Sequence, residues 1–212
     1  MHSRILKSAM IVACVLGLSA CEAMNLPQVS LPNVFSGDTG HQVALAEGLD
    51  FTLPTAPWDE DETIDVAQQV EAIWDTQTQS GTATFQGRIN IQPDHARIVM
   101  IDNLGRRAIE IDWTPQDIMI RKANWLPQEF DTKRLLADIV MTYWPLDAVE
   151  DALPDNMSVH EGFGERTIRL NDTGRKYATI ERPIKDVWQG QAKLENQHFK
   201  YRIKINSLRT GT

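Results

Sequence analysis

A helical segment at residues 130–154 interrupts a chain whose other patterned segments all favour β-strand. Apolar side chains recur between Leu135 and Tyr143 at spacings of one, three and four residues, which places them on one face of a helix that Asp131 can N-cap. Pro145 ends this helix, and a second short amphipathic helix follows it. In an antiparallel sheet protein, such a bent pair of helices must lay its apolar face on the concave side of the sheet, as a plug, a lid or core.

Segments that alternate apolar and polar side chains lie on both sides of this insert. Short polar turns separate them at intervals of about ten residues, which is typical of an antiparallel meander and not of a parallel sheet. About 150 residues of this pattern are enough for one hydrophobic core and too few for two. The expected strands cover residues 66–74, 85–91, 97–101, 108–113, 118–121, 159–160, 167–170, 176–181, 187–195 and 199–205.

Residues 1–20 have the features of a secretory signal. Arg4 and Lys7 precede an apolar run that is too short to span a bilayer. The run ends in Leu18-Ser19-Ala20-Cys21, which resembles the bacterial lipobox and predicts lipidation of Cys21. The alternative is an ordinary secreted protein with an incidental Cys21. Because Glu22 and not aspartate follows the cysteine, resemblance to other bacterial lipoproteins implies sorting to the outer membrane.

Removal of the signal changes the number of cysteines and the net charge of the mature chain. Cys14 leaves with the signal and Cys21 becomes a thioether, so no disulfide is expected. Loss of Arg4 and Lys7 makes the formal net charge of −8 two units more negative. This acidic balance argues against nucleic acid as a partner and against a basic grip on anionic lipids. Membrane contact is expected through the lipid anchor or through apolar side chains.

Residues 21–62 are rich in Pro, Gly, Ser and Asn and end in the acidic cluster 59–62. We expect a flexible, lipidated tether with a mean reach of roughly 35 Å. Within it, the segment from Gln42 to Gly48 is compatible with a helical turn or with a peripheral strand. The acidic cluster lacks the ligand spacing of a calcium loop, so a solvated charge run is expected.

Motifs for catalysis are not found in the sequence. It contains no G-x-S-x-G, no phosphate-binding loop and no H-E-x-x-H. The histidines of the mature chain are far apart in the sequence. The best candidate for a catalytic pair of carboxylates is Glu161 with Glu165, around the turn Gly162-Phe163-Gly164. We therefore expect no enzymatic activity, no metal and no cofactor.

Tryptophan, methionine and aliphatic side chains are spread over the strands and the insert. Each taken alone is expected to fill the core, but together they suit a curved sheet that encloses an apolar cavity. The residues expected to line this cavity are Trp74, Phe85, Ile89, Met100, Ile111, Trp113, Met119, Leu136, Ile139, Val140 and Trp144.

Two resemblances follow from particular motifs. The turn Asn103-Leu104-Gly105 and an insert that runs into Trp144-Pro145-Leu146 resemble the LolA/LolB family of outer-membrane lipoprotein-sorting proteins. A closer resemblance covers about residues 63–208. It is to a lipoprotein family of unknown function whose members are often encoded among aryl polyene biosynthesis genes. It rests on Ala137-Asp138, residues 143–148, Arg166 and Leu194-Glu195-Asn196.

These resemblances imply a mainly β (α+β) fold in which residues 63–212 form an incomplete antiparallel β-barrel. The two-helix insert then covers the open, concave side, and the cavity takes acyl chains. Leu104, at the tip of its turn, is implied to help deliver cargo into the membrane. The expected function is lipid or lipoprotein transport, or envelope assembly, at the periplasmic face of the outer membrane, with a periplasmic carrier as partner. The alternative is a structural lipoprotein with a filled core that binds an envelope protein.

Overall fold

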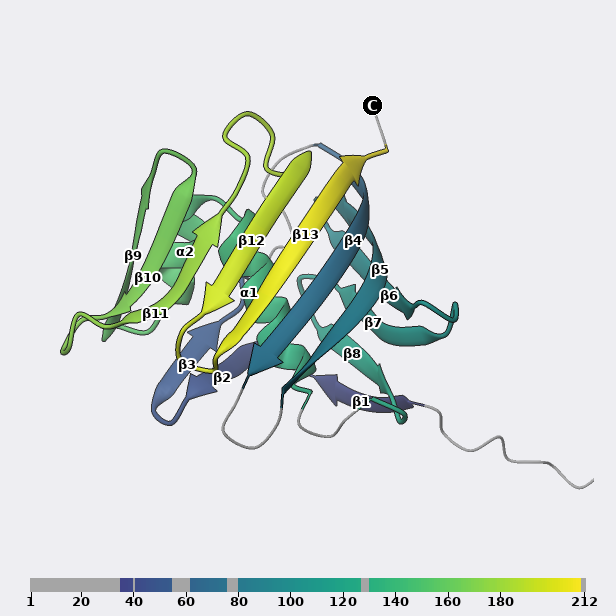
Figure 1. Cartoon of the computed structure of the whole chain (residues 1–212), viewed down its shortest axis with the longest axis horizontal. Helices are drawn as coiled ribbons and strands as arrows, with labels where there is room; N and C mark the ends of the chain where they lie inside the picture. Colours follow the sequence, from purple (N-terminus) through teal and green to yellow (C-terminus); the bar gives the residue numbers. More distant parts are fainter. Residues whose placement is uncertain (1–34, 40, 55–61, 76–79, 127–129, 211–212) are drawn as a thin grey trace, which may run out of the picture. The chain divides into compact units, whose positions relative to one another are not determined.

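Strands from both halves of the sequence pair into one antiparallel sheet (Figure 1). The computed structural model describes residues 35–39, 41–54, 62–75, 80–126 and 130–210. The chain divides into two units, Met1–Pro32 and Asn33–Thr212, and all described residues belong to the second. The predicted signal peptide and Cys21 lie outside the described residues. In chain order the elements are β1 (Phe35–Thr39), β2 (Gln42–Ala46), β3 (Leu49–Thr52), β4 (Ile64–Asp75), β5 (Ser80–Gln92), β6 (His95–Asp102), β7 (Arg107–Trp113), β8 (Ile118–Ala123), α1 (Thr132–Tyr143), α2 (Leu146–Ala152), β9 (Met157–Gly162), β10 (Glu165–Leu170), β11 (Lys176–Glu181), β12 (Gly190–Asn196) and β13 (Tyr201–Arg209).

The main sheet contains eleven of the described strands, in the order β1-β8-β7-β6-β5-β4-β13-β12-β11-β10-β9. β4 lies beside β13, with Val66 opposite Arg209 and Trp74 opposite Tyr201, so the first strand of the meander is next to the last. The end strands β1 and β9 do not pair with each other, which leaves the sheet open. The predicted mainly β fold with an incomplete antiparallel barrel is therefore confirmed.

The helical insert forms the two helices that the sequence predicts. Asp131 is the N-cap of α1 and its side chain accepts the backbone N–H of Arg134 at 3.0 Å. α1 ends at Tyr143, with Trp144 as its C-cap. Pro145 is the N-cap of the second helix, α2. In Figure 1, α1 lies on one side of the main sheet, behind β12, β13 and β4, where its buried face joins the core. We call this side of the sheet its inner face.

A short hairpin corrects the predicted tether of residues 21–62. β2 and β3 pair antiparallel, and Val43, Leu45 and Phe51 on them are fully buried. The hairpin contacts both helices, and the Tyr177 hydroxyl donates to the Leu45 carbonyl at 3.4 Å. A flexible tether is thus wrong for this stretch, because its alternating apolar side chains bury against the helices. β1, which pairs with β8, also belongs to the folded unit.

Candidate functional site

A pocket of about 30 Å³ lies between α1 and the inner face of the main sheet. α1 contributes one face of its helix, with residues at spacings of three and four, and the sheet contributes side chains from five strands. Most of the lining is apolar. The lining residues are Val70, Gly87, Ile89, Ile98, Met100, Leu135, Ile139, Leu194, Ile203 and Ile205, with Gln68, Asp138 and Thr142 as the polar members.

The size of this pocket limits what it holds in the conformation described. A volume of about 30 Å³ is enough for a water molecule, whereas pockets that hold small ligands measure about 300–1,000 Å³. The space between sheet and helix is thus largely filled by side chains. An acyl chain can enter only if α1 moves away from the sheet.

The residues expected from sequence to line a cavity fall into two groups on this side of the sheet. Ile89, Met100 and Ile139 do line the pocket. The others are buried in the surrounding core without lining it: Phe85, Ile111, Trp113, Leu136, Val140 and Trp144. Ile98, Gly87 and the polar lining residues were not among the sequence candidates.

Two further candidates lie away from the pocket. Trp74 is half-buried at the end of β4, and its ring lies over Gly81 on the neighbouring strand. Met119 is 37% exposed and accepts a hydrogen bond from the Arg121 guanidinium through its sulfur. On β8 the flanking residues, Ile118 and Ile120, point inward. The alternation of side chains along a strand therefore puts Met119 on the outer face and corrects its assignment to the cavity.

Asp138 is the charged residue of the pocket lining. It is 3% exposed, and its Oδ2 accepts a hydrogen bond from the Tyr201 hydroxyl at 2.5 Å. Asn196 holds Tyr201 in place, because its Nδ2 donates to the Tyr201 oxygen at 3.2 Å while its Oδ1 accepts the Phe199 N–H. The second oxygen of Asp138, Oδ1, is buried and has no hydrogen-bond partner among the described residues. A buried acid with a half-used carboxyl group thus borders an apolar pocket.

Burial raises the pKa of Asp138 to about 7, against the opposing effects of the Tyr201 hydrogen bond and the Arg134 charge. The carboxyl group in the unfolded chain has a pKa near 3.8. Between these two values the folded state holds a proton that the unfolded chain has lost. The contribution of Asp138 to stability is therefore greatest at low pH and declines as the pH rises from about 4 to about 7.

The Asp138→Asn variant is expected to remove this pH dependence. The difference in unfolding free energy between wild type and variant should shift against the wild type by on the order of 4 kcal/mol from pH 4 to pH 8, since each unit of pKa is worth about 1.4 kcal/mol. Urea denaturation at several pH values measures it. Asp151→Asn, on the exposed face of α2, is the surface control. A difference that stays constant between pH 4 and pH 8 contradicts the assignment.

The C-terminal end of α1 is anchored by aromatic side chains. Tyr143 stacks on Trp188 with ring centroids 4.3 Å apart, and Trp144 stacks on Trp113 at 5.4 Å. The Gln68 amide donates to the Tyr143 hydroxyl at 3.0 Å. These contacts tie the last turn of α1 to β4, β7 and the loop before β12.

Two arginines hold the same end of the helix through its carbonyl groups. Arg166 is fully buried, and its Nη1 donates to the carbonyls of Met141 at 2.7 Å and Trp144 at 3.0 Å. Arg182 donates to the Thr142 carbonyl at 3.0 Å. Glu161 bridges both guanidinium groups, at 2.5 Å and 2.6 Å.

This arrangement gives Glu161 a structural role, as the partner of Arg166 and Arg182. Burial acts to raise the pKa of Glu161, but hydrogen bonds from Arg182 and Arg166 outweigh it and hold the pKa below its usual value. Glu165 accepts a hydrogen bond from Thr167 at 3.3 Å instead. The two carboxylates therefore have different partners. The expectation that the protein is not an enzyme stays a prediction.

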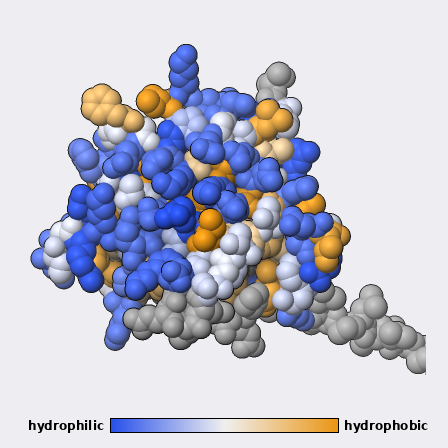
Figure 2. All heavy atoms as spheres, in the orientation of Figure 1, coloured by the Kyte–Doolittle hydropathy of each residue, from blue (hydrophilic) through white to orange (hydrophobic). Residues whose placement is uncertain are grey.

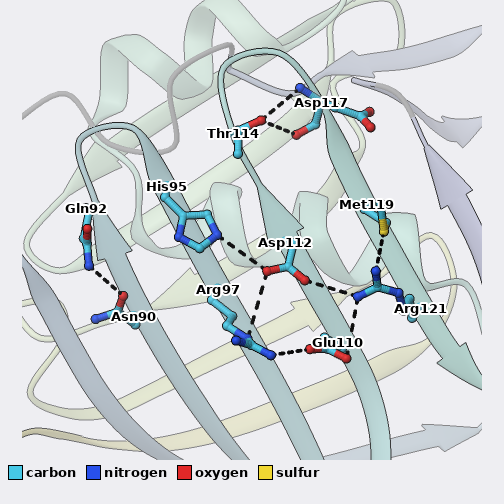
Figure 3. Close-up of polar contacts among 10 residues, drawn as sticks. All are labelled: Asn90, Gln92, His95, Arg97, Glu110, Asp112, Thr114, Asp117, Met119 and Arg121. Atoms are coloured by element: carbon cyan, nitrogen blue, oxygen red, sulfur yellow. Dashed lines mark hydrogen bonds and ion pairs between the residues drawn. The ribbon is translucent and has the colours of Figure 1, made fainter.

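The outer face of the main sheet carries a separate ion-pair network (Figure 3). Arg97 donates to Glu110 at 2.6 Å, Arg121 donates to Asp112 at 3.3 Å, and His95 lies 3.5 Å from Asp112. Burial acts to raise the pKa of Glu110, but the Arg97 hydrogen bond and the neighbouring guanidinium charges hold it below its usual value. Acids and bases are paired with each other here, so the network stabilises the outer face of β6, β7 and β8.

Exposed apolar side chains occur at the turns. Leu104 is 78% exposed in the β6–β7 turn, where Asp102 accepts the Leu104 N–H at 3.0 Å. Its position at the tip is as expected, and its role in delivering cargo stays a prediction.

Phe163 and Ile184 are exposed at another place on the surface. Ile184 lies beside the β9–β10 turn, because a Cβ on Gly164 would be only 3.1 Å from it. In Figure 2 hydrophobic atoms stand out at the upper left, in the region where Figure 1 shows the β9–β10 turn.

Neither helix of the described part of the chain has the length and apolar content needed to cross a bilayer. Within the same residues, histidine, cysteine and acidic side chains do not gather into a group that could hold a metal ion.

The fold and the pocket define a class of protein: an open antiparallel sheet whose inner face is closed by a helix over a small apolar pocket. The chain belongs to the family described as "Protein of unknown function (DUF3261)", which it matches over residues 65–209. The match extends from β4 to the end of β13 and includes the whole pocket.

Among solved structures, the chain is similar to a crystal structure from Vibrio parahaemolyticus of a domain described as an outer membrane lipoprotein-sorting protein. The TM-score is 0.32 and the identity 10%, over 70% of this chain and 86% of that one. A likeness this weak supports no conclusion about ligands or partners. Among curated proteins no significant match was found. The association with aryl polyene genes stays a prediction.

Proposed function

We propose that this protein is an envelope lipoprotein that binds a lipid or acyl chain between α1 and the inner face of its main sheet. The observation that supports this most is the apolar pocket under α1, with Gly87 leaving its floor without a side chain. Attachment through Cys21 to the periplasmic face of the outer membrane, and exchange of the lipid with a periplasmic carrier, belong to the same proposal and rest on the sequence resemblances.

Binding requires α1 to act as a lid. Its C-terminal end is held by Arg166, Arg182 and the aromatic contacts, so we expect the helix to pivot about that end. Opening exposes the apolar side chains of Leu135 and Ile139, at a cost of about 1.5–3 kcal/mol each. Each buried methylene of a ligand returns about 0.8 kcal/mol. Association also costs at least about 4 kcal/mol in translational and rotational freedom. Chains of about ten or more carbons can offset both costs, and much shorter ones cannot.

A series of saturated fatty acids tests this proposal. The full chain carrying Cys21→Ser is used, so that its own lipid anchor does not compete. A ligand at a hundred times its Kd stabilises the folded state by about 2.7 kcal/mol. For a protein of this size, this is a rise in Tm of about 5–10 °C. Dodecanoate is expected to raise the Tm and hexanoate is not. The proposal is contradicted if no fatty acid changes the Tm and mass spectrometry detects no lipid in the protein purified from cells.

A second function is favoured by a different observation. Phe163 is fully exposed in the β9–β10 turn with a φ of 53°, and Ile184, 77% exposed, lies near this turn. A structural lipoprotein with a filled core would use such a surface to contact an envelope protein. It would give no Tm response to any fatty acid, and its function would be lost on Phe163→Ser.

A further inference from the structure

The carboxyl group of Asp138 has a free acceptor position beside the pocket. Asp138 lines the pocket, and only 3% of its surface is exposed. Its Oδ1 has no hydrogen-bond partner among the described residues. A buried polar atom without a partner is costly, and the lining around it is mostly apolar, with Gln68 and Thr142 as its other polar members. A ligand group that hydrogen-bonds to Oδ1 would remove this cost.

The surrounding hydrogen bonds leave Oδ1 as the oxygen that is available to a ligand. Oδ2 is engaged by the Tyr201 hydroxyl at 2.5 Å. Tyr201 cannot turn away easily, because its oxygen accepts from Asn196, whose own Oδ1 accepts the Phe199 N–H. The network thus fixes one side of the carboxyl group and leaves the other unsatisfied.

We infer that Asp138 binds a hydroxyl group carried by the apolar chain, so that the preferred ligand is a hydroxylated acyl chain. This inference rests on the proposed function, since it names the ligand of the same pocket. The apolar lining from Ile89, Met100 and Ile203 accommodates the hydrocarbon, and Oδ1 accepts the hydrogen bond of the hydroxyl.

The chemistry of the carboxyl group favours a hydroxyl over other polar groups. A hydroxyl donates to an ionised carboxylate and accepts from a protonated one, so it satisfies Oδ1 in either state. A carbonyl or ether oxygen can only accept. A cationic group is disfavoured because Arg134, one turn earlier on α1, already places a positive charge near Asp138.

Comparison of three kinds of acyl chain tests the inference on the full-length protein carrying Cys21→Ser. The probes are dodecanoate, its hydroxylated forms with the hydroxyl at positions 2, 3 and 12, and the corresponding methoxy forms. The titrations are made at pH 8, above the pKa of Asp138 of about 7, where the carboxyl group is mostly ionised. At least one hydroxylated chain is expected to bind about tenfold or more tightly than dodecanoate, as a hydrogen bond to a charged group implies. The methoxy form of that chain should lose this advantage. In Asp138→Leu the ratio of the two affinities should fall close to one.

The outcomes separate this inference from the proposed function. Equal affinities for plain, hydroxylated and methoxy chains overturn the inference and leave acyl binding intact. Binding of none of the chains overturns both. Because the three kinds of chain are compared on the unmodified pocket, the test does not depend on whether Asp138→Leu folds. If that variant folds and keeps the preference for the hydroxyl, Asp138 is not its source.

Discussion

Replacing Arg166 with methionine is expected to lower the free energy of unfolding by about 3–5 kcal/mol, the usual cost of breaking a buried ion pair. Arg166 is fully buried and satisfies the carbonyls of Met141 and Trp144 at the end of α1, together with Glu161. Methionine fills similar space but leaves these acceptors without a donor. Urea denaturation followed by far-UV circular dichroism measures the loss.

A matched surface variant shows whether the effect comes from burial. Arg202 pairs with Glu195 at 3.2 Å, with both side chains 42% exposed. Exposed pairs of this kind are worth about 1 kcal/mol or less, so Arg202→Met should change stability little. If the two variants are equally stable, Arg166 is not the anchor of α1 that the structure indicates.

The strands and helices follow from local patterns in the sequence. Alternation of apolar and polar side chains predicted the strands β4 to β13, and the spacing from Leu135 to Tyr143 predicted α1 with Asp131 as its N-cap. The bend at Pro145 is equally local, because proline cannot continue a helix. These features depend on neighbours in the chain, and a single sequence contains them.

Other features depend on contacts between distant residues. The hairpin β2–β3 has only a few alternating apolar side chains, and its burial depends on helices about a hundred residues later. Met119 is a local exception, because it lies between the buried Ile118 and Ile120 and strand alternation therefore places its side chain on the opposite face. Arg166 and Glu161 gave no sign in the sequence that they meet at a helix end.

Asp138 could have been found from the sequence. It lies at helical spacing with Leu135, Ile139 and Thr142, so it is an acid on the face of α1 that the pattern predicted to be buried. Such an acid must be paired or protonated, which singles it out. Its partner Tyr201 is 63 residues away, and only the fold identifies it.

Filling the pocket from its floor is expected to weaken acyl binding at least about a hundredfold. Gly87 lines the pocket, and a Cβ there would meet Gln68 at 3.4 Å, an ordinary contact. Gly87→Ala should therefore be tolerated. Gly87→Leu extends three more carbons from the floor of a cavity of about 30 Å³. The cost of overpacking is about 1–3 kcal/mol, which the fold can bear.

The loss of binding free energy should be at least as large as the loss of stability. A leucine in the floor takes the place of several methylenes of the chain, which corresponds to about 3 kcal/mol or more and a Kd raised about a hundredfold. Gly87→Ala is the matched control, since it changes the same backbone position without filling the space.

Calorimetric titration of dodecanoate into the Cys21→Ser chain, alone and with Gly87→Ala or Gly87→Leu, tests the acyl-binding site under α1 most directly. We expect the parent and the alanine variant to bind one chain per protein, and the leucine variant to remain folded and bind at least about a hundredfold more weakly. Equal binding by a folded Gly87→Leu variant, or no binding by the parent, contradicts a site between α1 and the sheet.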